Sequence, residues 1–188
     1  TSDGGQSWLP QSNGQASGLL GVYFTDTNNG TAVGNDGVIL RTTDGGQNWI
    51  PQTSGTVNQL RAVWFTNSDT GIVVGDQGTI LRTTDNGKTW VPQDSGVSET
   101  LLNVSFSDPS NGIAVGQLGT IIRTTNGGQT WAREESGTNQ DLYGLSFPDT
   151  NTGNAVGAFG AILSTAAQGP TPRPRMTPRP RPTPAPRP

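Results

Sequence analysis

The 188-residue sequence contains no cysteine and no histidine. Without these residues the chain has no disulfide, no thiol nucleophile, few of the usual zinc or copper ligands, and no histidine general base at neutral pH. Much of enzymology is therefore excluded, and we expect neither a metal site nor a cofactor. No apolar run approaches the ~20 residues that cross a bilayer, so we expect no transmembrane segment.

Charge and proline divide the chain into two parts. Residues 1–169 hold all 14 acidic residues and six of the 11 basic ones, which gives this body a net charge of −8. Residues 170–188 hold five arginines, no acid and nine of the 14 prolines, which gives a net charge of +5. A segment so rich in proline cannot join a sheet and favours an extended polyproline II form. We predict a folded domain at 1–169 and a basic, proline-rich tail at 170–188.

An internal repeat organises the body. Tryptophan recurs at positions 8, 49, 90 and 131, a constant offset of 41. The same offset relates Phe24 to Phe65, Phe106 and Phe147 without an insertion or deletion. A fixed period of this length is the signature of a repeat architecture. Each repeat is therefore one structural unit.

Every repeat contains four short stretches that favour β-strands. In the first stretch, apolar residues such as Val22 and Phe24 alternate with a more variable face. The second and third stretches are joined by a Gly-x-x-Gly link, as from Gly34 to Gly37, which permits a tight hairpin. The fourth begins at the tryptophan, and its proline suits an edge strand. Four antiparallel strands in each repeat predict an all-β propeller of four blades.

The order of the strands predicts how the ring closes. The chain opens with a fourth strand at residues 8–11, and the last repeat stops after a third strand at residues 161–165. The N-terminal strand would therefore complete the last blade and close a four-bladed ring. Two alternatives stay open, namely that two chains join as an eight-bladed ring or that the blades stack openly between molecules.

Each repeat also carries the motif [S/T]-x-[D/N]-x-G-x-x-W, which resembles the Asp-box, or bacterial neuraminidase repeat. A carboxylate or amide oxygen at its third position can accept N–H bonds inside its own turn, and the tryptophan packs under the hairpin. The structural residues predicted in this way are Asp3 and Trp8, Asp44 and Trp49, Asp85 and Trp90, and Asn126 and Trp131. A lone carboxylate among glycines is a weak ligand set for calcium, so we expect a structural turn.

The wider pattern over residues 1–165, G-x-A-V-G-x-x-G-x-I-L-R-T-T-D-G-G-x-x-W, resembles the propellers of the photosystem II stability and assembly factors and their bacterial relatives. The resemblance implies a seven-bladed ring that docks on membrane or envelope partners and does no chemistry. This chain has about four repeats and so differs from that family in blade number.

Sialidases and xyloglucanases also contain Asp-boxes, so an enzyme is one alternative. A sialidase-like site needs three converging arginines and a tyrosine nucleophile, but Arg41, Arg82 and Arg123 occupy one repeated position and only Tyr23 and Tyr143 exist. A glycosidase needs a pair of carboxylates about 5 to 10 Å apart. The acids outside the repeated motif lie mostly in turns: Asp26, Glu99, Asp108, Glu134, Glu135, Asp141 and Asp149. We expect no catalytic residues, and a glycoside hydrolase relative is the weakest alternative.

Other residues are candidates for partner binding. Arg41, Arg82 and Arg123 end the third strands, where they either bond a neighbouring blade or form a positive ring, and Trp64 stands where the other repeats have Tyr or Ser. The tail adds four candidate arginines and three threonines that could carry O-linked glycans. They are Arg173, Arg175, Arg179 and Arg181, and Thr171, Thr177 and Thr183.

These features predict a non-catalytic structural or assembly protein, exported by a bacterium to the cell exterior or surface. An acidic body and a basic tail attract each other, so we expect self-association into a filament or array in which each tail docks on a neighbouring subunit. The alternative is a propeller module that binds a cell-surface protein or a glycan. Nucleic acid is not an expected partner, because the body would repel phosphate and the tail lacks stacking aromatics.

Overall fold

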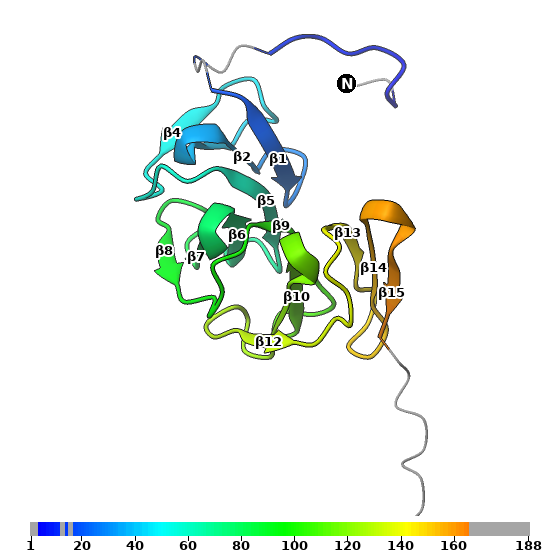
Figure 1. The fold of residues 1–188 in the computed structure, drawn as a ribbon. Coiled ribbons are helices and arrows are strands. Elements are labelled where there is room, and N and C mark those ends of the chain that lie inside the picture. The colour runs from blue at the N-terminus through cyan, green and yellow to red at the C-terminus, as the bar shows by residue number, and fades with distance from the viewer. Residues whose placement is uncertain (1–3, 12–13, 15–16, 166–188) are drawn as a thin grey trace, which may run out of the picture.

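The computed structural model describes residues 4–11, 14 and 17–165, which fold into antiparallel sheets set side by side in an arc (Figure 1). The proline-rich tail, with its predicted arginine and threonine sites and the boundary at residue 169, lies outside these residues. Between residues 17 and 165, and in the short N-terminal stretches, no helix is both long and apolar enough to cross a membrane.

Each sheet is built from one repeat, and within the described residues there are four of them. The first contains β1 (Leu19–Phe24), β2 (Gly30–Gly34), β3 (Ile39–Thr42) and β4 (Ile50–Gln52). The second contains β5 (Leu60–Phe65), β6 (Gly71–Gly75), β7 (Ile80–Thr83) and β8 (Val91–Gln93). The third contains β9 (Leu101–Phe106), β10 (Gly112–Gly116), β11 (Ile121–Thr124) and β12 (Ala132–Glu134). The fourth contains β13 (Leu142–Ser146), β14 (Asn154–Gly157) and β15 (Ile162–Ser164).

Strands follow one another in sequence order within every sheet, as in a propeller blade. The first strands of successive sheets, β1, β5, β9 and β13, contact one another and line the inside of the arc. The fourth strands, β4, β8 and β12, lie at the far edge of their sheets. The all-β propeller architecture predicted from the repeat is therefore what the chain adopts.

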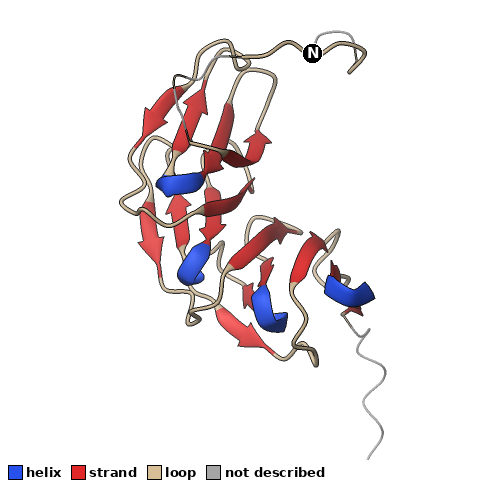
Figure 2. Cartoon of the chain, turned by 45° about the horizontal axis from the view of Figure 1, so that its top comes forward, coloured by secondary structure: helices blue, strands red, loops and turns tan. Residues whose placement is uncertain are grey.

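The Gly-x-x-Gly links form the short turns η1 (Asn35–Gly37), η2 (Asp76–Gly78), η3 (Gln117–Gly119) and η4 (Ala158–Gly160), which Figure 2 shows along one side of the arc. In η1, Asp36 (φ 57°, ψ 26°) and Gly37 (φ 70°) are both left-handed, and the Val38 N–H bonds the Asn35 carbonyl at 3.1 Å. Two consecutive positive φ angles define the type I′ turn, whose twist matches that of the strands it joins.

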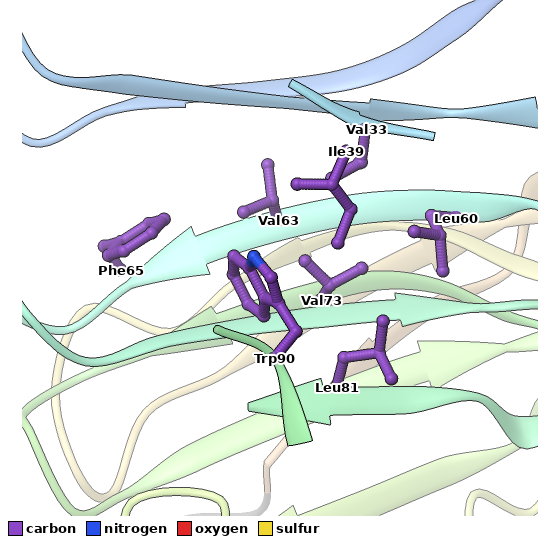
Figure 3. Close-up of a cluster of buried hydrophobic side chains, with 8 residues drawn as sticks. All are labelled: Val33, Ile39, Leu60, Val63, Phe65, Val73, Leu81 and Trp90. Atoms are coloured by element: carbon purple, nitrogen blue, oxygen red, sulfur yellow. The ribbon is translucent and has the colours of Figure 1, made fainter. Parts of the chain in front are cut away.

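The hydrophobic core lies between sheets. At the first junction, Val33 and Ile39 of the first sheet pack against apolar residues of the second, as Figure 3 shows. Those residues of the second sheet are Leu60, Val63, Phe65, Val73, Leu81 and Trp90. The junctions between the second and third sheets and between the third and fourth use the same repeat positions. Each of the two middle sheets thus buries one face against the sheet before it and the other against the sheet after it.

The predicted closure by the N-terminal strand is absent from this structure. Residues 8–11 form no strand, the fourth sheet has three strands among the described residues, and the Trp8 side chain is exposed. Figure 1 shows the N-terminal segment extending away from the sheets. Closing a ring of four would require the last sheet to pack on the first, and in the described part of the chain these two sheets do not pack on each other.

Two glycines near the same turn test how tightly the hairpins are packed. Gly78 (φ +64°) and Gly96 (φ +69°) are both left-handed, but only at Gly78 would a Cβ overlap a backbone atom, the carbonyl oxygen of Val97. We expect Gly96→Ala to lower the free energy of unfolding by about 1 kcal/mol, the cost of a left-handed alanine. Gly78→Ala should lower it by at least roughly 3 kcal/mol, because the backbone must also shift.

Urea denaturation followed by tryptophan fluorescence measures both variants. Equal losses for the two would show that the hairpin and the following loop are not packed as described.

Candidate binding surfaces

The Asp-box turns use their carboxylates for local hydrogen bonds. Asp44 accepts bonds from the Thr42 hydroxyl at 2.8 Å, the Asn48 backbone N–H at 2.9 Å and the Asn48 side chain at 2.8 Å. The Asn48 side chain makes the largest contribution to lowering the Asp44 pKa below its usual value. Both carboxylate oxygens are thus engaged within the turn itself rather than directed at a substrate or cation.

Asp85 has the most strongly lowered pKa among the described carboxyl groups. Partial desolvation raises this pKa, but bonds from the Thr89 backbone N–H, the Thr89 hydroxyl and the Thr83 hydroxyl outweigh it and lower the pKa to about 2. In the third repeat Asn126 accepts two of the equivalent bonds, from the Thr124 hydroxyl and the Thr130 N–H, and its side-chain N–H donates to the Thr130 hydroxyl. An amide can therefore take the place of the carboxylate in this turn.

A second polar turn occurs in every repeat, which the sequence interpretation missed. Asp26, Asp108 and Asp149, taken there as acids outside the repeat, share one repeat position, which Asn67 occupies in the second repeat. Each accepts two backbone N–H bonds in the turn between the first and second strands, as Asp108 does from Ser110 and Asn111. These bonds lower the pKa of Asp108, the Ser110 N–H most strongly. A glycosidase acid needs its pKa raised, so these carboxyls are poor candidates.

The repeated arginines connect neighbouring sheets. The Arg41 Nε donates to the backbone carbonyl of Asn86 at 2.7 Å, and the Arg82 Nε donates to that of Gly127 at 2.8 Å. Asn86 and Gly127 occupy the fourth position of the Asp-box in the following repeat. The two arginines therefore hold the Asp-box turns of the second and third sheets against the sheet before each of them, and their Nε atoms are not directed at a ligand.

Arg123 is the third arginine, and its Nε is buried without a hydrogen-bond partner among the described residues. It lines a cleft of about 700 Å³ between the third and fourth sheets, together with Ile121, Phe147, Leu163 and Thr165. In the other three repeats, the phenylalanine equivalent to Phe147 packs edge-on against an Asp-box tryptophan, at ring-centre distances of 6.0 to 6.1 Å. In the cleft, the described residues include no tryptophan packed on Phe147 and no hydrogen-bond partner for the Arg123 Nε.

The tips of the hairpin turns form a second candidate surface, here called the hairpin rim and defined by Asp36, Gln77, Leu118 and Phe159. These residues share one repeat position, and all four are left-handed, with φ between 52° and 57°. The first two are polar, but Leu118 is 60% and Phe159 97% exposed. Large apolar residues in a left-handed conformation cost free energy. The third and fourth repeats thus differ from the first two in presenting a large apolar side chain to solvent at this position.

Acidic groups lie on or beside the hairpin rim at the first three of its four turns. Asp36 lies in η1, Asp76 of η2 pairs with Arg61 at 2.8 Å, and the Asp141 carboxylate accepts the Leu118 backbone N–H at 2.9 Å. Val57, in the loop that contacts η1, adds an exposed apolar side chain. An apolar surface with acidic neighbours suits a partner that is both apolar and basic.

Trp64, a candidate binding residue, lies between sheets. Its side chain is half-buried against the core of the second junction, and its ring centre is 5.3 Å from that of Tyr23. Of the Asp-box residues, Asp3 lies outside the described residues. Trp90 is buried, Trp49 and Trp131 are half-buried, and Trp8 is exposed, with its Nε1 donating to the Gly5 carbonyl at 3.2 Å.

A family model described as Photosynthesis system II assembly factor YCF48 matches residues 1–94 and 48–133, more than half of the chain. No curated protein matches the sequence.

Solved structures resemble the fold. A structure described as YCF48 bound to D1 peptide is 24% identical, with a TM-score of 0.66, over 78% of this chain and 48% of that one. YCF48 from Cyanidioschyzon merolae is 22% identical, with a TM-score of 0.66, over 78% of this chain and 50% of that one. An ancestral GH74 enzyme is 18% identical, with a TM-score of 0.68, over 82% of this chain and 24% of that one. This chain therefore spans about half the length of the YCF48 structures.

The contrast between Asp85 and Asn126 predicts a pH effect. A carboxyl whose pKa is lowered from 3.8 to about 2 stabilises the fold above pH 4, and this contribution is lost as the pH falls through 2. In Asp85→Asn the amide replaces the carboxylate as Asn126 does, so stability near pH 7 should be nearly unchanged and the loss between pH 4 and pH 2 smaller than in the wild type.

Thermal unfolding at half-unit steps of pH measures this difference, with Asn126→Asp as the reciprocal variant, which should steepen the acid loss. Identical acid profiles for the three proteins would refute the role assigned to the Asp85 hydrogen bonds.

Proposed function

This chain belongs to the Photosynthesis system II assembly factor YCF48 family, and from that premise we propose that it is a non-catalytic propeller that binds protein segments at its hairpin rim. The observation that supports this most directly is the exposure of Leu118 and Phe159 in left-handed turns. A fold that needed only a turn would favour Asn, Asp or Gly at these positions. Strained apolar side chains that face solvent are typical of contact residues.

The structure of a relative supports the proposal that the partner is a protein. One YCF48 structure holds a peptide of D1, so a propeller of this family binds a protein segment. That relative is 24% identical and about twice as long, so its particular partner is not carried over to this chain. The hairpin rim of this chain indicates its own preference, for a segment that is apolar and basic.

The chain's own tail is such a segment. Residues 170–188 alternate proline with arginine, threonine and alanine, and extended proline-rich segments dock on exposed aromatic and apolar surfaces. The net charge of −8 on residues 1–169 complements the +5 on the tail. We therefore propose that the tail of one molecule binds the hairpin rim of another, outside the cell, and links copies into an assembly.

The catalytic alternative has less support. GH74 enzymes share the fold, but at 18% identity this likeness extends to architecture alone. In the described part of the chain, the Asp-box and strand-turn carboxylates are engaged in turn hydrogen bonds, and two of the three repeated arginines bond backbone carbonyls. We expect no hydrolysis of xyloglucan or of sialosides.

Binding of a labelled peptide with the sequence of residues 170–188 tests the proposal. The host is the chain ending at residue 169, because every contact described above lies within residues 4–165. We expect the double variant Leu118→Asn/Phe159→Asn to weaken binding at least about tenfold, since it removes the apolar contacts while asparagine tolerates the left-handed turn. The matched control Gln77→Asn changes the same repeat position and should bind as the unchanged host does.

Fluorescence anisotropy measures the affinity. A peptide in which every arginine is glutamine should also bind more weakly, and increasingly so at low salt, where charge contributes most. If the tail peptide does not bind, the tail is not the partner. If a displayed peptide library also enriches no sequence on the host relative to the double variant, the binding function itself fails.

A further inference from the structure

We propose that the arginines of a bound tail are selected at one place beside the hairpin rim, by a cluster here called the arginine subsite and defined by Leu118, Asp141, Tyr143 and Phe159. The Asp141 carboxylate pairs with an arginine side chain, and the other three side chains pack against the prolines on either side of that arginine. The inference rests on the proposed function, because it names the residues that select the partner.

Asp141 lies between the two turns that carry the exposed apolar residues of the rim. Its carboxylate oxygen Oδ1 accepts the backbone N–H of Leu118, in η3, at 2.9 Å. Its backbone carbonyl accepts the N–H of Ala158, in η4, at 2.8 Å, and Ala158 directly precedes Phe159. One residue is thus bonded both to the turn of the third sheet and to the turn of the fourth.

Tyr143 reaches solvent through a β-bulge. The register of β13 against β14 shifts between Leu142 and Gly144, which leaves Tyr143 as the extra residue. Bulges turn a side chain away from the regular pleat, and they are frequent beside functional sites. Tyr143 is 55% exposed, while Leu142 before it is buried. Since β13 also contacts η3, Tyr143 is carried by the strand that lies next to Leu118.

The arginine subsite is a place where several repeat positions depart from the pattern together. Leu118 and Phe159 are apolar at the tip position, which is polar in the first two repeats. Asp141 is acidic at a position where the earlier repeats have no acid. Those repeats have Gly18, Gln59 and Thr100 there. The departures bring an acid and apolar side chains to the same junction between sheets.

The exposure of these side chains does not come from the ends of the arc. Leu118 belongs to the third sheet, which has a neighbouring sheet on each side, and it is still 60% exposed. Arg61 and Leu102 occupy the bulge position of Tyr143 in the second and third sheets, and they are partly exposed there. Tip and bulge residues thus face solvent even in sheets that are covered on both faces.

The Asp141 carboxylate is available for a cation from a partner. Asp76, beside the preceding turn, is already neutralised by Arg61, whose guanidinium nitrogens lie 2.8 and 3.3 Å from its two oxygens. Within the described part of the chain, Asp141 forms no salt bridge and its Oδ2 accepts no hydrogen bond. Arginine suits this place better than lysine does, because its planar guanidinium also stacks on aromatic rings.

The tail supplies this chemistry. In residues 178–182, Pro-Arg-Pro-Arg-Pro, each arginine has a proline on both sides. Proline-rich segments favour an extended form, and they dock on surfaces lined by aromatic side chains. An arginine of one tail therefore binds Asp141 of another molecule, and its flanking prolines contact Leu118, Tyr143 and Phe159.

A double-mutant cycle between host and peptide tests the subsite. The probes are a labelled peptide of residues 177–183 and a version with glutamine at positions 179 and 181, and fluorescence anisotropy measures their binding to the chain ending at residue 169. We expect Asp141→Asn to weaken binding of the arginine peptide at least about fivefold and to leave binding of the glutamine peptide nearly unchanged, because only arginine pairs with the carboxylate.

Two controls accompany the cycle. The asparagine oxygen of Asp141→Asn can still accept the Leu118 N–H, so an unchanged thermal unfolding midpoint shows that this host is folded. Asp36→Asn removes the same charge from another turn of the rim and should change the affinity less than about twofold. Equal losses in Asp36→Asn and Asp141→Asn would assign the effect to overall charge and overturn the subsite.

The outcomes separate this inference from the proposed function. If Leu118→Asn/Phe159→Asn weakens binding of the arginine peptide and Asp141→Asn does not, the rim binds the tail but Asp141 does not select arginine. If neither peptide binds the unchanged host, this inference fails, and the library selection described above still decides whether the rim binds proteins. The intact 188-residue chain should give the same order of affinities.

Discussion

The whole structure depends on burial between sheets. Each repeat makes a sheet with an apolar layer on both faces, and such a sheet has no interior of its own. Val33 and Ile39 are buried only because the second sheet covers them, and Leu60 and Val63 only because the first does. At about 25 cal/mol per Å² of apolar surface removed from water, burial at the junctions stabilises the fold. This accounts for an arc in which contacts run from neighbour to neighbour.

Polar side chains in the turns provide hydrogen-bond partners for backbone groups that the strands leave unpaired. Asp44 and Asp85 hold their own Asp-box turns, and Arg41 also holds the Asp85 turn against the preceding sheet. These repeated side chains are thus engaged in structural hydrogen bonds. The residues that distinguish the chain are those that break the repeat. They are Leu118 and Phe159 on the hairpin rim, and Arg123, whose Nε has no partner in the described part of the chain.

Much of the fold was predictable from a single sequence, because the repeat is free of insertions and the alternation of Val22 and Phe24 sets which face is buried. Other features were missed for identifiable reasons. Asp26, Asp108 and Asp149 were taken as isolated acids because the second repeat has Asn67 at the equivalent position. The offset of 41 residues would have shown that all four share one repeat position. Trp64 was a candidate surface contact, but the contact of its ring with Tyr23 arises across a junction and has no local signal.

By itself the sequence determined the repeat, the strands, the Asp-box turns and the family resemblance, because each depends on residues close together in the chain. Only the tertiary structure decided how far the arc curves, which ends remain uncovered, and which of the described side chains lack partners. These features depend on the angle at which one sheet packs on the next. That angle is set by many small contacts between residues in different repeats. A repeat pattern is the same for a closed ring of four and for part of a larger ring, so closure could not be read from it.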